Sequence, residues 1–290
     1  PEFHDFLVSW FDDKLATLKP HRNVNTVAPL LALTYLYEDD PRPQWKAVME
    51  DWVDWVMHDM PRTNYGGFQH MTVLEYNEQQ LWDDTLFMTV LFLARAGIIF
   101  NRPELVEESK RQFLVHVKFL QDPGTGLFYH GWTFKEMNNF GAIFWARGNS
   151  WFTSGAVEFL EMCGASDGVG MFLKDCLADQ VQALVRLQRK DGLFCTVLDD
   201  ADSYAETSAT ANIAYALLKG IRLGYIDARY AQSAQAAVDA VIAQIGADGT
   251  VGGVSYGTGM GMNKEHYTSI AITPTGDGQG LTLLMLSELI

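Results

Sequence analysis

The chain has 290 residues, 48% of them hydrophobic, so it can bury a sizeable core. Its 21 lysines and arginines face 36 aspartates and glutamates, and the net charge of −15 argues against nucleic acids and anionic membranes as partners. No apolar run is long enough for a membrane-spanning helix. Three cysteines without metal-ligand spacing are expected to be free thiols, which fits a reducing, cytoplasmic location.

Ten segments have the hydrophobic pattern of a helix, and two kinds alternate. Helices of the first kind are amphipathic, and helices of the second kind are apolar on nearly every side. Beginning with an amphipathic one, they are expected at Phe6–Leu18, Thr26–Tyr37, Pro43–His58, Trp82–Gly97, Glu104–Leu120, Ser150–Cys163, Phe172–Gln188, Thr207–Gly224, Tyr230–Ile245 and Asp277–Ile290. Because a helix that is apolar on every side is buried on every side, the alternation predicts an all-α fold: an (α/α)6 barrel in which inner helices are wrapped by outer ones.

A short turn of the form Gly-x-aromatic or Gly-x-Val repeats along the chain, at Gly67, Gly126, Gly192 and Gly249. A period of about sixty residues indicates one repeated supersecondary unit. Since the repeat runs through the middle of the sequence, we expect a single catalytic domain over residues 1–290. Six helix pairs at this period would need about 350 residues, so we expect the barrel to lack its first helix pair and the domain to be incomplete at its N-terminus.

The segment Leu81-Trp82-Asp83-Asp84-Thr85 places an aromatic face beside two carboxyl groups at the start of an apolar helix. An indole face stacks on the C–H face of a sugar, while the sugar's hydroxyls need polar partners. One aspartate could simply cap the helix. We expect Asp83 to do so and Asp84 to point into the ring of helices, where burial would raise its pKa and the helix dipole would lower it.

A second segment, Trp145-Ala-Arg147-Gly-Asn149-Ser-Trp151, holds a guanidinium between two indoles. Arg147 could be a cation–π contact within the core. Gly148 and Asn149 instead suggest a tight loop that enters the next helix and exposes Arg147 at a rim, where it could bind a ligand. Both segments therefore predict a carbohydrate site.

Two histidines end equivalent turns of the repeat, at His70 and His130, and should lie on one face of the ring. Trp132, close to His130, offers another stacking surface. Lesser candidates are Glu206, expected to cap the following helix, and His266 with Tyr267 in the last loop. The glycine-rich stretch Gly257–Gly261 does not have the context of a nucleotide site, and no spacing predicts a metal or a cofactor.

With these residues in view, the chain resembles glycoside hydrolase family 105, the unsaturated rhamnogalacturonyl hydrolases, over nearly its whole length. The resemblance is carried by both tryptophan segments, and it extends through the motifs Gly66-Gly67-Phe68-Gln69-His70, Tyr129-His130-Gly131-Trp132 and Gly278-Gln279-Gly280. It implies an (α/α)6 barrel without a cofactor. It also implies a small oligosaccharide substrate, derived from pectin, that ends in a 4,5-unsaturated galacturonate.

The resemblance also implies roles for the residues. Asp84 would be the general acid and base, and it would hydrate the vinyl ether of the unsaturated sugar. The substrate would be bound by His70, Trp82, His130, Trp132, Trp145, Arg147 and Trp151. Three alternatives stay open: an unsaturated glucuronyl hydrolase acting on other lyase products, an inactive sugar-binding relative, and a sugar epimerase that uses His70 and His130.

Overall fold

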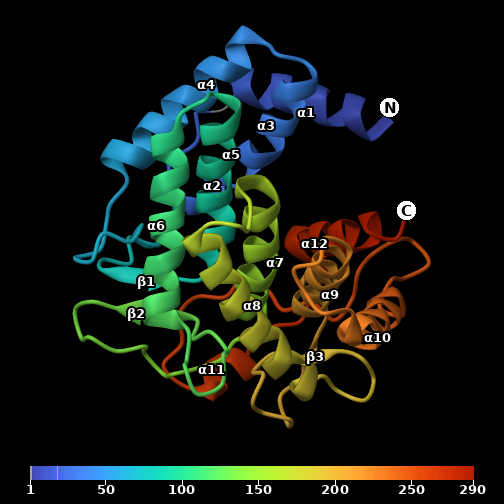
Figure 1. Ribbon diagram of the computed structural model, residues 1–290. Coiled ribbons are helices and arrows are strands. Elements are labelled where there is room, and N and C mark those ends of the chain that lie inside the picture. Colours follow the sequence, from blue (N-terminus) through green and yellow to red (C-terminus); the bar gives the residue numbers. More distant parts are fainter. Residues whose placement is uncertain (1, 18) are drawn as a thin grey trace. The chain divides into compact units, whose positions relative to one another are not determined.

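The computed structural model describes residues 2–17 and 19–290 (Figure 1). The chain divides into two compact units. The first unit comprises residues 1–81 and 85–115, and the second comprises residues 82–84 and 116–290. That the whole chain forms one domain stays a prediction. None of the helices in the described part of the chain combines the length and apolar character that a membrane span requires.

The first unit is built of helices. They are α1 (Glu2–Thr17), α2 (Val24–Val27), α3 (Pro29–Asp39), α4 (Pro43–Asp54) with the π-helical turn η1 (Trp55–Asp59), the π-helical turn η2 (Leu86–Val90), α5 (Leu91–Ile99) and most of α6 (Pro103–Leu120). Asn23 caps α2 through a capping box, and Pro29 and Pro43 open α3 and α4, where a missing N–H costs little.

The second unit contains α7 (Ala146–Cys163), α8 (Gly168–Leu187), α9 (Thr207–Arg222), the 3-10 turn η3 (Ala228–Tyr230), α10 (Ala231–Ile242), α11 (Lys264–Thr268) and α12 (Gly276–Ser287). Four short strands are present in the described chain: β1 (Gln80–Trp82), β2 (Gly131–Thr133), β3 (Phe194–Cys195) and β4 (Ala205–Glu206). Strand β3 pairs antiparallel with β4, with Phe194 opposite Glu206. Helix α9 packs against α7, α10 and α12 (Figure 1).

The repeated turn is a real structural unit, although its first marker lies one residue earlier than expected. Gly66, Gly126, Gly192 and Gly249 all have a positive φ, between 81° and 88°, which only glycine adopts readily. Two residues after each of them, the chain enters a β-bridge or strand at Phe68, Phe128, Phe194 and Val251. The sequence period therefore reflects one turn used four times.

The contrast between apolar and amphipathic helices is confirmed for the central helices of the second unit. Every residue of α7 from Ala146 to Leu160 is buried, whereas α8 buries only one stripe. Two expectations were wrong. Helix α12 is buried on one face alone, and its Leu283 is 57% exposed. The helix predicted to begin at Trp82 begins two residues later, at Asp84, because Trp82 belongs to strand β1.

A buried charged network joins α7 to α9. Glu158 accepts hydrogen bonds from the Tyr215 hydroxyl and from the Lys219 ammonium group, and all three residues are buried. Burial lowers the pKa of Lys219. The charge of Glu158 and the hydrogen bond between Lys219 and Glu158 outweigh burial and raise this pKa well above its ordinary value. The three cysteines are free thiols, as expected.

Candidate functional site

The two aspartates lie in the second unit, and both carboxyl groups are buried. Asp83 is 0% and Asp84 is 7% exposed. The backbone of Asp83 is held by its N–H, which donates to the carbonyl oxygen of His130 at 3.2 Å. Since His130 follows the turn at Gly126, the repeat brings it beside the acidic pair.

Asp83 does not cap the helix that follows, so that expectation was wrong. Neither of its carboxyl oxygens has a hydrogen-bond partner among the described residues. The carboxyl group of Asp83 lies instead against the first turn of α7, where its Oδ2 would be 2.4 Å from a Cβ placed on Gly148. Glycine at position 148 therefore leaves room for this carboxyl group.

His130 connects the acidic pair to the last loop of the chain. Its Nε2 lies 3.5 Å from Asp84 Oδ2, and its Nδ1 lies 2.7 Å from the hydroxyl oxygen of Tyr267. The imidazole is enclosed by indoles, with ring centroids 5.0 Å from Trp82 and 4.3 Å from Trp145. Burial lowers the pKa of His130, and the neighbouring Asp84 offsets only part of that effect. The imidazole is therefore neutral at neutral pH.

Tyr267 is a site residue that the sequence hardly indicated. It is fully buried and packs with Ile143, Trp145 and Val197 in one apolar cluster. Its hydroxyl also accepts a hydrogen bond from the N–H of Gly261 at 3.1 Å. The signal that could have found it is the capped helix α11, in which the Asn263 side chain accepts from the N–H of His266.

Arg147 is buried and only 3% exposed, so the expected position at a rim was wrong. Its Nη1 donates to the side chain and the carbonyl oxygen of Ser255, and its Nη2 donates to the carbonyl oxygen of Tyr256 and to Thr258 Oγ1. The guanidinium also lies 4.8 Å from the ring centroid of Trp145, which is the cation–π contact that the sequence left open. Arg147 thus fastens the loop Ser255–Thr258 to α7.

Two carboxylates lie at the same guanidinium group. Glu206 Oε1 and Asp277 Oδ2 are each 3.8 Å from Arg147 Nη1. Glu206 caps α9 as expected, because its side chain accepts from the N–H of Ala209. It also accepts from the N–H of Ser255 at 2.9 Å, so Glu206 and Arg147 hold the same loop.

The remaining predicted residues occupy different places. Trp145, the N-cap residue of α7, is 1% exposed, and Trp151, within the second turn of the helix, is 4% exposed. Trp132, in β2, packs on Phe119 with ring centroids 5.4 Å apart. The indole N–H groups of Trp132 and Trp145 are buried and have no hydrogen-bond acceptor among the described residues, which leaves both available to a sugar hydroxyl or a water molecule.

His70 belongs to the first unit, where it is buried and its Nδ1 lies 3.0 Å from Thr85 Oγ1. Thr85 directly follows Asp84 in the chain. The structure thus brings Trp82, Asp84, His130, Trp145 and Arg147 together within one unit and places His70 in the other.

Asp83, Asp84 and His130 are the residues that could in principle hold a metal ion, since one donor atom of each lies within 4.8 Å of the others. Burial, followed by the charge of Asp84, raises the pKa of Asp83 well above its ordinary value. Since a metal ligand must be deprotonated, an ion bound here would have to displace a proton that Asp83 holds more tightly than usual.

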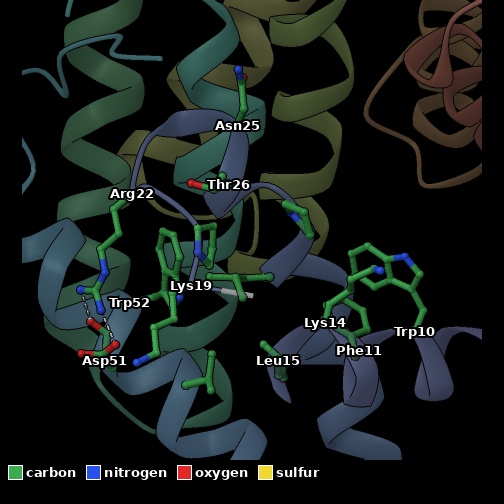
Figure 2. A pocket seen from close by; sticks show the side chains of 14 residues that line it. Trp10, Phe11, Lys14, Leu15, Lys19, Arg22, Asn25, Thr26, Asp51 and Trp52 are labelled. Carbon is green, nitrogen blue, oxygen red and sulfur yellow. Dashed lines mark hydrogen bonds and ion pairs between the residues drawn. The ribbon is translucent and has the colours of Figure 1, made fainter. Parts of the chain in front are cut away.

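The first unit contains a separate cleft that the sequence did not indicate (Figure 2). It has a volume of about 520 Å³ and is lined by α1, residues 19–22, α2, the start of α3, and α4. Its walls include Trp10, Phe11 and Trp52, and an ion pair between Arg22 and Asp51 lies at its edge. None of the predicted site residues lines it.

Comparison with known proteins places the chain beside enzymes of one kind. The sequence profile of Glycosyl Hydrolase Family 88 matches residues 1–290. The unsaturated rhamnogalacturonyl hydrolase YesR of Bacillus subtilis (strain 168) is 34% identical over 292 residues, which cover 100% of this chain and 83% of that protein.

Solved structures agree with the sequence comparison. A possible member of the GH105 family from Klebsiella pneumoniae is 44% identical and superimposes with a TM-score of 0.98, covering 99% of this chain and 76% of that one. The unsaturated glucuronyl hydrolase of Bacillus sp. GL1 is 17% identical with a TM-score of 0.74, covering 96% of this chain and 78% of that one, and shares the fold alone. These matches confirm both the predicted (α/α)6 class and the resemblance to family 105.

Proposed function

The chain belongs to Glycosyl Hydrolase Family 88 and is a glycoside hydrolase, and on this basis we propose that it removes a terminal 4,5-unsaturated galacturonate from rhamnogalacturonan oligosaccharides. The substrate is suggested by the relative that is 34% identical over the full chain and is named for this activity. The observation that carries the proposal is the position of Asp84. Its carboxyl group is buried, and one of its oxygens lies 3.5 Å from a histidine nitrogen that tryptophan rings enclose.

The proposed reaction hydrates a vinyl ether. Asp84 gives its proton to C4 of the unsaturated sugar, and the π electrons of the C4–C5 bond form the new C–H bond. The positive charge that develops at C5 is shared with the ring oxygen. Water then adds to C5 and returns a proton to the Asp84 carboxylate, which restores the acid. The resulting hemiketal opens at the bond between C5 and the ring oxygen, which leaves a ketone at C5 and a hemiacetal at C1. The hemiacetal then breaks its C1–O bond to the neighbouring sugar, which takes up the hydroxyl proton and leaves as an alcohol, while C1 becomes an aldehyde.

This chemistry needs one carboxyl group that acts first as an acid and then as a base. Ordinary glycosidases instead use two carboxyl groups that flank the scissile bond, about 5–9.5 Å apart. Asp83 and Asp84 are adjacent in the chain and share one small volume, so they cannot flank a sugar. The arrangement therefore favours hydration over direct displacement.

We assign the recognition of the sugar to aromatic faces and to buried donors. Trp82, Trp145 and Trp151 provide indole surfaces, and the N–H groups of Trp132 and Trp145 provide donors for hydroxyl groups. Arg147 orders the loop Ser255–Thr258, because its terminal nitrogens are bonded there. His70 is a further sugar contact that the family resemblance implies.

Kinetic assays on two lyase products test the proposal. One disaccharide carries unsaturated galacturonate on rhamnose, and the other carries unsaturated glucuronate. The wild-type protein should abolish the ultraviolet absorbance of the first, and in D2O the product should gain one deuterium at C4. Asp84→Asn should lower kcat at least about a hundredfold with an unchanged Tm, since the acid is lost and the shape is kept. Turnover of the variant at the wild-type rate would overturn the role of Asp84.

The second candidate is an unsaturated glucuronyl hydrolase. It is favoured by the "Unsaturated 3S-rhamnoglycuronyl hydrolase" of Formosa agariphila, which is 28% identical over 50% of this chain, although that match covers only 41% of the other protein. Faster loss of absorbance with the glucuronate disaccharide would select it. If neither disaccharide is consumed, calorimetry that shows binding by wild type and Asp84→Asn alike would point to an inactive sugar-binding relative.

A further inference from the structure

We infer that Asp83, Asp84 and His130 form a binding site for one Zn²⁺ ion, and that an ion bound there blocks catalysis. The binding follows from the geometry of the three side chains. The block rests on the role of Asp84 in the function proposed above, because an ion on its carboxylate takes the place of the catalytic proton. No spacing of residues in the sequence predicted this site.

The three side chains converge in a buried part of the second unit. One carboxyl oxygen of Asp83, one of Asp84 and a ring nitrogen of His130 all lie within 4.8 Å of one another. His130 Nε2 and Asp84 Oδ2 are 3.5 Å apart. Two ligands bound at about 2.1 Å to a tetrahedral zinc ion are roughly 3.4 Å apart, so these two atoms already have the spacing of a coordinated pair. Asp84 is 7% exposed, and this exposed part gives an ion access from solvent.

A second observation concerns the hydrogen bonds of the donor atoms. Asp83 is 0% exposed, and neither of its carboxyl oxygens has a hydrogen-bond partner among the described residues. In the same part of the chain, Nε2 of His130 is also buried without such a partner. Buried polar atoms are nearly always hydrogen-bonded, so a group of orphaned atoms at one place indicates a ligand. A cation satisfies these atoms together, because carboxylate oxygens and an imidazole nitrogen all offer it electron pairs.

The surrounding chain holds Asp83 in the position of a ligand. Its backbone N–H donates to the carbonyl oxygen of His130, so the main chain ties two of the ligands together. Its Oδ2 occupies space that a Cβ at Gly148 would need, at 2.4 Å. An arrangement that exists before the ion arrives favours affinity, because little ordering of the chain is required on binding.

His130 has the outer hydrogen bond that a zinc-binding histidine requires. Its Nδ1 lies 2.7 Å from the hydroxyl oxygen of Tyr267. A tyrosine hydroxyl group can donate to this nitrogen or accept from it. When Nε2 binds the ion, Nδ1 carries the proton and donates it to the tyrosine oxygen, which orients the ring toward the metal. Tyr267 is therefore the outer partner of the site.

The donor set selects the kind of ion. One imidazole nitrogen and two carboxylate oxygens suit Zn²⁺, which binds three protein ligands and leaves a fourth position to water. Mg²⁺ and Ca²⁺ require six or more ligands, mostly oxygen atoms, and the three side chains do not supply them. Burial makes the proton of Asp83 hard to remove. The same low polarity strengthens the attraction between a divalent cation and both carboxylates, and this attraction offsets the cost of losing the proton.

Titration of the metal-free protein with Zn²⁺ is the first test. Calorimetry at neutral pH should show one ion bound per chain, and the Tm should rise with the Zn²⁺ concentration, because a ligand of the folded state stabilises it. Mg²⁺ at the same concentrations should have neither effect. X-ray absorption spectra of the zinc-loaded protein should show nitrogen and oxygen ligands at about 2.0–2.2 Å. Sulfur ligands, or the absence of bound Zn²⁺, would overturn the inference.

Matched variants assign the ion to these residues. Tyr267→Phe should weaken Zn²⁺ binding about ten- to a hundredfold, as the loss of an outer partner does. Asp83→Asn and His130→Gln each remove a ligand and should weaken it at least about a hundredfold. Asp202→Asn and His58→Gln change an exposed carboxyl group and an exposed histidine, and they should bind like wild type. Wild-type affinity in Asp83→Asn would place the ion elsewhere and overturn the site. If that variant fails to fold, His130→Gln and the absorption spectrum of wild type decide the question.

Turnover measurements separate this inference from the proposed function. Zn²⁺ should inhibit the loss of absorbance of the galacturonate disaccharide over the concentrations at which it binds, and a chelator should restore the rate. Binding that leaves turnover unchanged would overturn the block. If Asp84→Asn is inactive but wild type binds no Zn²⁺, the proposed function survives and the metal site fails. If wild type binds one ion through Asp83 but consumes neither disaccharide, the metal site survives and the proposed function fails.

Discussion

The Nδ1 atom of His130 lies 2.7 Å from the hydroxyl oxygen of Tyr267, a residue 137 positions later in the chain. The same hydroxyl accepts from the N–H of Gly261 and lies 3.7 Å from Met260 Sδ. We predict that it donates its proton to Nδ1, which is a stronger acceptor than a thioether sulfur, so that His130 carries its own proton on Nε2, which faces Asp84. On this prediction, the last loop sets the tautomer of the histidine beside the acidic pair.

Replacing Tyr267 with phenylalanine tests this relationship. Tyr267→Phe leaves Nδ1 of His130 buried without its donor, and an unsatisfied buried group costs about 1–3 kcal/mol. We expect kcat/KM to fall about tenfold or more, and the ring nitrogen signals of His130 in NMR spectra to show a mixture of tautomers.

Tyr225→Phe is the matched control, since the Tyr225 hydroxyl donates to the carbonyl oxygen of Leu160, away from the acidic pair. It should leave both kcat/KM and the His130 signals unchanged. A Tyr267→Phe variant whose His130 signals match those of wild type would show that the tyrosine does not select the tautomer.

A second prediction concerns Arg147 and its loop. Lysine keeps the positive charge but lacks the planar guanidinium group, whose N–H groups donate to Ser255, Tyr256 and Thr258. We expect Arg147→Lys to lower kcat/KM about a hundredfold and to speed amide hydrogen exchange in residues 255–261, as measured by mass spectrometry.

The same experiment separates two roles of the arginine. If Arg147 mainly bound the uronate carboxylate, Arg147→Lys would raise KM and leave hydrogen exchange in the loop at the wild-type rate. Exchange in helix α8, which lies outside this network, should stay unchanged in either case and provides the internal control.

A third prediction concerns the buried network between α7 and α9. Lys219→Met leaves the Glu158 charge without its ammonium partner, and breaking a buried ion pair costs about 3–5 kcal/mol. Chemical denaturation should show this loss at neutral pH. Despite burial, the charge of Glu158 raises the pKa of Lys219. The ion pair therefore contributes its full stabilisation to the folded state at neutral pH, and this stabilisation is lost only as pH rises through the raised pKa.

The double variant Glu158→Leu with Lys219→Met removes both charges and should recover most of the lost stability. Activity per folded molecule should match wild type in both variants, because this network takes no part in the proposed chemistry. A Lys219→Met variant with the same free energy of unfolding as wild type would mean that the ion pair contributes little to folding.

The amino-acid sequence by itself determined the helices and turns, because both depend on short-range patterns of residues. Apolar residues on every side predicted the buried helices α7 and α9, and the glycine repeat marked four turns that share a left-handed residue. The same local signals placed Asp84 and His130 among the candidates, and Glu206 at the cap of α9. Helical periodicity and positive φ are properties of a few neighbouring residues, so they can be recognised without the fold.

Only the tertiary structure decided which side chains meet. Asp83 points to Gly148 instead of capping a helix, and Arg147 is buried because its partners, at Ser255 to Thr258, come from a loop more than a hundred residues away. Tyr267 enters the site by the same kind of distant contact. The protonation of a buried carboxyl group depends on its depth and on such neighbours, and the spacing of residues along one chain carries no record of either.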